Sequence, residues 1–153
     1  MNNLLTGAVA GTVATVPMTI FWEAMHDRMP GEPPRPLPPR EVAEALVVKA
    51  GVSRQLSETE MEWLSMALHF GYGAFTGAIF GTIAPRHIGG GMFAGALFGL
   101  GVWSASYLGW LPAAGVRHSP RYDVPARTRL IVVSHLVWGA AAGLLLGVRR
   151  AAR

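Results

Sequence analysis

The chain contains no cysteine, one lysine and few charged residues of any kind. The lack of cysteine excludes disulfides, thiolate-bound iron–sulfur clusters and catalysis by a thiolate. Charged residues make up 14% of the chain, against about 25% in a typical soluble domain. The net charge of +4 comes almost wholly from arginine, without the interleaved aromatic residues of a nucleic-acid-binding surface. The composition therefore indicates a membrane protein and argues against a nucleic-acid partner.

Hydrophobic residues make up 51% of the sequence and gather in four long segments. A helix needs about 20 apolar residues to cross a hydrocarbon core of about 30 Å. Backbone polar groups in lipid must be bonded within the protein, which a helix achieves. We therefore predict an all-α fold in which residues 1–153 form a single integral membrane domain, a four-helix transmembrane bundle. The predicted membrane helices span about residues 4–27, 58–83, 90–111 and 128–148.

The first connection is long and has two parts. Residues 30–39 contain six prolines, which predicts a stiff, extended loop. Residues 40–50 have apolar positions at helical spacing but are too few to span, so we predict a short helix at the membrane interface. Ser57 and Glu60 form a capping-box pattern that starts the next helix. Nine of the 13 basic residues lie in the first and third connections, which favours a cytoplasmic location for both.

One spacing occurs twice in the chain. His69 and His135 are each followed by glycines at every fourth position, and an aromatic residue, Tyr72 or Trp138, lies three places after each histidine. This pattern predicts a parallel tandem repeat of two helical hairpins, related by a pseudo-two-fold axis along the membrane normal. Glycines four apart let helix backbones approach closely in lipid. The predicted packing glycines are Gly7, Gly11, Gly73, Gly77, Gly81, Gly91, Gly95, Gly99, Gly139, Gly143 and Gly147.

The predicted helices alternate in direction, so all the glycine rows fall in the half of the membrane that is next to the two termini. We expect the bundle to be narrow there and to spread toward the first and third connections. The spread end collects polar and aromatic side chains and forms a polar vestibule. Within it, His69 and His135 are expected to face each other.

Six residues at this polar end are candidates for binding a ligand or relaying protons. Ionisable groups inside a membrane are costly and are therefore functional candidates, and histidine titrates near neutral pH. In the alternative interpretation, each histidine is neutral and serves packing through a hydrogen bond to another helix. The two matched histidines could also hold a metal ion or the iron of a b-type haem. The candidates are Glu23, His26, His69, Tyr72, Tyr107 and His135.

The first predicted helix contains Gly7-x3-Gly11-Thr12-x2-Thr15-x-Pro17-Met18, and the second and fourth contain His-x2-aromatic-Gly-x3-Gly. In these segments the chain resembles the YagU-like families of small uncharacterised bacterial inner-membrane proteins. The resemblance implies a multi-pass protein of the bacterial inner membrane and no established biochemistry.

Three functions are consistent with these patterns. The favoured hypothesis is an accessory or ligand-holding subunit, in contact with the lipid bilayer and with a larger membrane complex or a second copy of the chain. The alternatives are a small transporter of protons, ions or solutes, and a haem-binding electron carrier. The sequence has no Ser-His-Asp arrangement, phosphate loop or zinc motif, so no catalytic residue is predicted and an enzyme is not favoured.

Overall fold

The computed structural model describes residues 2–26, 28, 38–52, 56–85 and 87–152, except for the side chain of Arg150. Within these ranges the chain forms helices and no strand, which confirms the all-α prediction. The loop predicted at residues 30–39 lies outside the described residues as far as residue 37, and its last two prolines begin a helix. The elements are α1 (Asn3–His26), α2 (Pro38–Lys49), α3 (Glu58–Ile83), α4 (Ile88–Trp103), the π-helix η2 (Ser104–Trp110), α5 (Leu111–Ala113), the 3-10 helix η3 (Pro120–Tyr122) and α6 (Pro125–Ala151).

Three helical segments are long and apolar enough to cross a membrane: α1, the continuous run from α4 through η2 to α5, and α6. They indicate a multi-pass membrane protein. Helix α3 has 26 residues and is therefore about 39 Å long, enough to cross a membrane. It is not among the three segments because it is less apolar than they are. His69 and Tyr72 both lower its hydropathy. The fourth span, and with it the four-helix transmembrane repeat, stays a prediction.

The capping box predicted at the start of α3 is present. The backbone N–H of Ser57 donates to Glu60 Oε2 over 2.8 Å, and the N–H of Glu60 donates to Ser57 Oγ over 3.3 Å. Helix α2 packs against the same end of α3, where Arg40 Nη2 lies 2.7 Å from Glu58 Oε2. The hydrogen bond with Glu58 raises the pKa of Arg40. The apolar contact between the two helices is formed by Ala43, Val47 and Met61.

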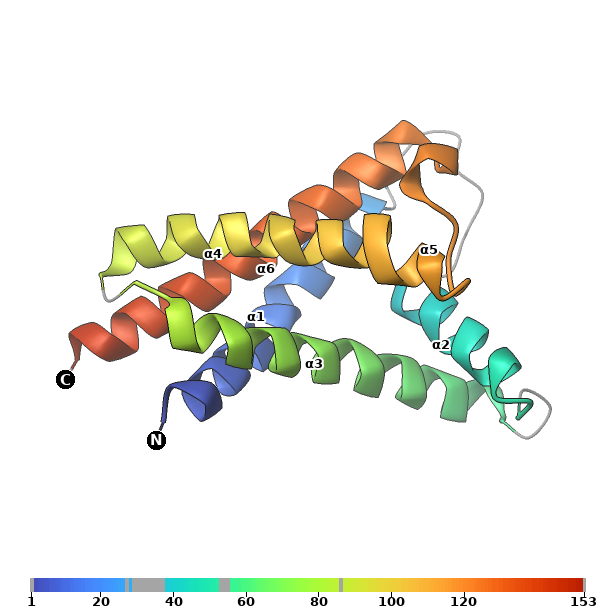
Figure 1. Cartoon of the computed structure of the whole chain (residues 1–153), viewed down its shortest axis with the longest axis horizontal. Helices are drawn as coiled ribbons and strands as arrows, with labels where there is room; N and C mark the ends of the chain where they lie inside the picture. The colour runs from blue at the N-terminus through green and yellow to red at the C-terminus, as the bar shows by residue number, and fades with distance from the viewer. Residues whose placement is uncertain (1, 27, 29–37, 53–55, 86, 153) are drawn as a thin grey trace.

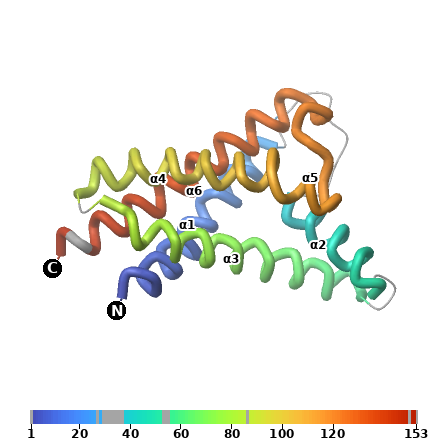
Figure 2. Tube along the Cα trace, in the orientation of Figure 1, coloured from blue at the N-terminus to red at the C-terminus, as the bar shows by residue number. Residues whose placement is uncertain are grey.

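The long helices form two crossing pairs, α1 with α3 and α4 with α6 (Figure 1). Helices α1 and α6 also pack against each other, behind α3 and α4 in this view. Helices α3 and α4 follow each other in the chain but make little contact. Both termini lie at one end of the molecule, and α2 and α5 lie at the opposite end, where the long helices spread apart (Figure 2).

The crossing of α1 and α3 brings backbone against backbone. A Cβ atom added to Gly11 would lie 2.2 Å from the carbonyl oxygen of Gly73, and one added to Gly77 would lie 2.6 Å from Gly11 Cα. Real side chains do not occupy such positions, so only glycine permits this approach. Gly7 and Gly81 repeat the contact one turn nearer to the termini.

Helices α4 and α6 cross in the same way but in a different register. Gly11 and Gly99 hold matching positions in the sequence repeat, and so do Gly73 and Gly139. Gly11 meets the carbonyl of Gly73, whereas Gly99 meets the carbonyl of His135, four residues before Gly139. Four residues are about one helical turn, or about 6 Å. The second pair is therefore displaced by one turn, and the two crossings are not equivalent.

The two pairs are joined along α1 and α6. Small residues line this seam, where Ala10, Ala14 and Ala142 are buried in one cluster with Trp138. The indole Nε1 of Trp138 donates to the carbonyl oxygen of Gly11 over 3.0 Å. This bond fastens the second crossing pair to the centre of the first.

The Gly77→Ala substitution tests the α1–α3 crossing. Its Cβ would meet backbone atoms of Gly7 and Gly11, so the helices must separate, and we expect a loss of about 2 kcal/mol in the free energy of unfolding. The control is Gly101→Ala, because a Cβ there meets nothing within 4 Å. It should be neutral or slightly stabilising, since alanine favours the helix by about 1 kcal/mol. Unfolding in mixed detergent micelles, followed by circular dichroism, measures both. Equal losses in the two variants would contradict the proposed contact.

Candidate functional site

A cavity of about 180 Å³ lies at the spread end of the molecule, between α3 and η2. Helices α1, α2 and α6 also line it, and α4 and α5 contribute Val102 and Leu111. Its polar and aromatic lining includes His69 and Tyr72 of α3, Ser106 and Tyr107 of η2, and His135 and Trp138 of α6. Because α3 and α4 make little contact, the cavity occupies the space that their divergence leaves.

The π-helix η2 forms one wall of the cavity. It carries Ser106 and Tyr107, both of which are buried and line the cavity. A π-helix is wider than an α-helix, is rare, and occurs frequently at functional sites. Pro112 follows it in α5. Proline has no backbone N–H, so it cannot donate a hydrogen bond to the carbonyl of residue 108, and its ring also clashes with that carbonyl. The irregular hydrogen bonding thus begins about two turns before Pro112, a residue that cannot continue a regular helix.

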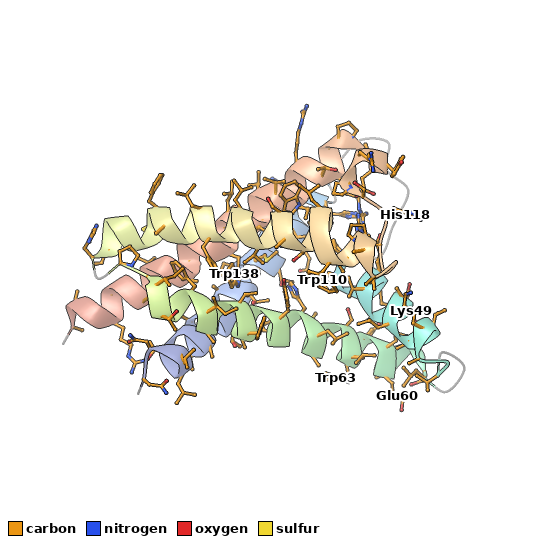
Figure 3. The ribbon with its side chains drawn as sticks, in the orientation of Figure 1. Lys49, Glu60, Trp63, Trp110, His118 and Trp138 are labelled. Carbon is orange, nitrogen blue, oxygen red and sulfur yellow. The ribbon has the colours of Figure 1, made fainter. Side chains whose placement is uncertain are left out.

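Tyr72 connects α3 to η2 across the front of the cavity. Its hydroxyl lies 2.9 Å from Ser106 Oγ, and either oxygen can be the donor. Its ring centroid lies 6.1 Å from that of Trp110. Figure 3 shows Trp110 and Trp138 in the space between α4 and α3. Tyr72 and Trp110 therefore form an aromatic wall on this side of the cavity, and one hydrogen bond joins it to Ser106.

His69 is held against α1. Its Nε2 lies 3.2 Å from Thr19 Oγ1, and the Thr19 hydroxyl donates its one hydrogen to the carbonyl of Thr15 over 2.9 Å. Thr19 must therefore accept from His69, so Nε2 carries the hydrogen. This places a hydrogen bond between the two helices of the first pair, just beyond their glycine crossing.

His135 lies deeper than its counterpart. It is 8% exposed, whereas His69 is half-buried, because the one-turn displacement puts the His135 backbone at the second crossing itself. Its Nδ1 lies 2.8 Å from the carbonyl of Ile131 on the same helix. Its ring meets the Tyr107 ring edge-on, with centroids 5.7 Å apart. The two histidines line one cavity but stand in different environments.

Four of the six predicted site residues line this cavity: His69, Tyr72, Tyr107 and His135. The other two are not among its lining residues. Glu23 is exposed, and the ring of His26 stacks on Trp22 with centroids 5.6 Å apart. Among the described residues, no group of three or more His, Cys, Asp or Glu side chains is placed to hold a metal ion.

Charged residues form a separate cluster next to the cavity. Glu41 of α2 is paired with Arg117 and, over 2.7 Å, with Arg127 at the start of α6. Arg117 also pairs with Asp123 over 2.5 Å, and its guanidinium lies 5.3 Å from the centroid of the Tyr107 ring. The cluster fastens α2 to the start of α6 and to the segment before it. It holds Pro38, Pro39, Val42 and Leu46 of α2 against the cavity.

Two parts of this site were not predicted from the sequence: the ion cluster and the π-helix. The charges of the cluster come from three separate segments with no shared spacing, so no sequence pattern connects them. Pro112 was the one available sign of an irregular helix, since proline breaks regular helical hydrogen bonding.

A family model described as "Protein of unknown function (DUF1440)" matches residues 16–144. The match covers most of the chain, which therefore belongs to this uncharacterised family. Searches of the curated proteins and of the solved structures found no match.

The Glu41→Gln substitution tests the ion cluster. Arg127 is fully buried, and removing a carboxylate partner from a buried cation destabilises by about 3 kcal/mol. We expect a loss of this size in the free energy of unfolding in detergent micelles. The control is Glu44→Gln on the same helix, because Glu44 pairs with Arg40 and is 43% exposed. Its effect should stay below about 1 kcal/mol, and a similar loss in both variants would contradict a special role for Glu41.

Proposed function

We propose that this member of the DUF1440 family holds a small, mainly apolar molecule inside the membrane, in the cavity between α3 and η2. One observation carries the proposal: a cavity of about 180 Å³ has aromatic walls with hydroxyl and imidazole groups at a few points. Small-molecule sites commonly combine apolar walls with a few placed polar groups. An apolar cavity of about 150 Å³ is large enough to bind benzene. The ligand-holding hypothesis is therefore the favoured one.

The proposed setting is the bacterial inner membrane, with α3 as the fourth span of two tandem hairpins. Each pair of helices crosses through glycines, which supports the hairpin repeat, although the two registers differ by one turn. The resemblance to the YagU-like families supports the location. Assembly with a larger membrane complex or with a second copy of the chain is part of the same proposal, as an accessory protein that presents its ligand to a partner.

A proton relay through Glu23, His69 and His135 is less well supported. Glu23 is exposed and does not line the cavity, so the three residues do not share one compartment. His69 uses Nε2 in its hydrogen bond with Thr19, and His135 uses Nδ1 in a bond to its own helix. Neither contact links one histidine to the other.

A bis-histidine haem does not fit the cavity. If about 150 Å³ is needed for one benzene ring, a porphyrin with four pyrrole rings requires far more than the 180 Å³ present. In addition, the Nε2 atom of His69 is already bonded to Thr19. Both observations favour a ligand of about one ring.

The Val42→Trp substitution tests whether the cavity binds such a ligand. Val42 lines the cavity from α2, and an indole at this position would fill it. The probe is 4-fluorotoluene, added to the purified protein in detergent and followed by ¹⁹F NMR. We expect saturable binding to the wild-type protein and binding at least about tenfold weaker in the variant, a loss of about 1.4 kcal/mol.

The matched control is Val48→Trp, on the same helix at a position that is 64% exposed. It should bind the probe like the wild-type protein. If the wild type and Val42→Trp give the same signal, the probe is only partitioning into detergent, and the proposed binding site is wrong.

A further inference from the structure

The described residues that line the proposed binding cavity carry no formal charge if the histidines are neutral. The arginines of the neighbouring cluster, Arg117 and Arg127, are paired with Glu41, and Arg117 also with Asp123. Among the described residues, the ion pairs of the cluster thus join two arginines to two carboxylates. An ion in the cavity would be buried without a partner, which is costly. The walls therefore select an uncharged molecule.

The aromatic walls favour a flat ring. Tyr72 and Trp110 line the cavity beside α3 and η2, and Tyr107 and Trp138 line it farther inside. Aromatic side chains prefer offset or edge-on contacts with another ring. The volume of about 180 Å³ is slightly larger than a cavity that accepts benzene. One ring with one or two small substituents fills this space.

The hydrogen bond of His135 determines which of its nitrogens is free. A carbonyl oxygen can only accept, so Nδ1 must donate to the Ile131 carbonyl and must carry the hydrogen. In a neutral imidazole, Nε2 is then an acceptor. Among the described residues, the His135 side chain makes its hydrogen bond to Ile131 through Nδ1, and none of them donates to its Nε2. A donor on the ligand satisfies it.

The hydroxyl groups in the cavity complement this acceptor. Tyr72 and Ser106 share one hydrogen bond but carry two hydroxyl hydrogens, so one hydrogen remains for another acceptor. A hydroxyl on the ligand both donates and accepts. A carbonyl or an ether group can only accept and would leave the acceptor on His135 unsatisfied, which carries a desolvation cost.

We infer that the molecule held in this cavity is an uncharged single-ring alcohol of the phenol class, whose hydroxyl donates to Nε2 of His135. The inference rests on the proposed function, because it names the class of ligand for the same cavity. It assigns His135 the specific role of a ligand-binding acceptor. His69, whose Nε2 is directed to Thr19, holds the first helix pair together.

The test compares 4-fluorophenol with 4-fluorotoluene, which have nearly the same shape and differ in the hydroxyl. Binding of each to the purified protein in detergent is measured by ¹⁹F NMR, with the blocked Val42→Trp variant as the baseline for partition into micelles. The quantity of interest is the ratio of the two dissociation constants. We expect His135→Leu to reduce the preference for the phenol by about five- to tenfold and to retain toluene binding.

The matched control is Thr76→Val. Thr76 also lines the cavity, but its hydroxyl donates to the carbonyl of Tyr72 in its own helix over 2.8 Å. The preference for the phenol should therefore be unchanged. A charged analogue, 4-fluorobenzoate, should not bind the wild-type protein, and saturable binding of benzoate would overturn the requirement for an uncharged ligand.

A second measurement uses the wild-type protein and so does not depend on the folding of a variant. With ¹⁵N-labelled histidine, the Nε2 resonance of His135 should move when 4-fluorophenol is added and stay in place with 4-fluorotoluene. If both probes bind equally in the wild type and in His135→Leu, the hydroxyl inference is wrong while the binding site stands. If neither probe binds the wild type, the proposed function itself is wrong.

Discussion

The approach of helix backbones at glycine positions is the contact on which the rest of this structure depends. At the crossings of α1 with α3 and of α4 with α6, the space for a side chain is occupied by backbone atoms of the partner helix. Lipid supplies no hydrophobic force between membrane helices, so dispersion contacts at such short range are their main source of association. Both crossings lie toward the termini, and helices that cross at an angle must diverge beyond the crossing.

The divergence creates the cavity, and polar contacts join the elements around it. Tyr72 and Ser106 connect α3 to η2, and Glu41 joins α2 to Arg117 and Arg127. The one-turn difference in register gives the two histidines unequal roles. His135 lies at a crossing and is buried, whereas His69 lies one turn beyond its crossing and bonds to Thr19. The same histidine–glycine spacing thus occurs in two different environments.

The helical class, the short helix after the proline-rich segment and the capping box of Ser57 and Glu60 could be predicted from the sequence, since each depends on local spacing. The grouping of His69, Tyr72, Tyr107 and His135 at one end followed from alternating helix directions. Glu23 and His26 were placed with them because they have the same depth. Depth along a helix does not determine which side of it a residue faces, and these two do not line the cavity.

The sequence by itself determined that the chain is helical, where its long helices form, and that one histidine–glycine spacing occurs in two of them. These properties depend on composition and on the helical period, which neighbouring residues establish. The tertiary structure decided the register of the two crossings, the π-helix at Ser106 and Tyr107, and the pairing of Glu41 with Arg127 across 86 residues. These depend on contacts between distant segments, where a shift of one helical turn preserves the sequence pattern and changes which side chains meet.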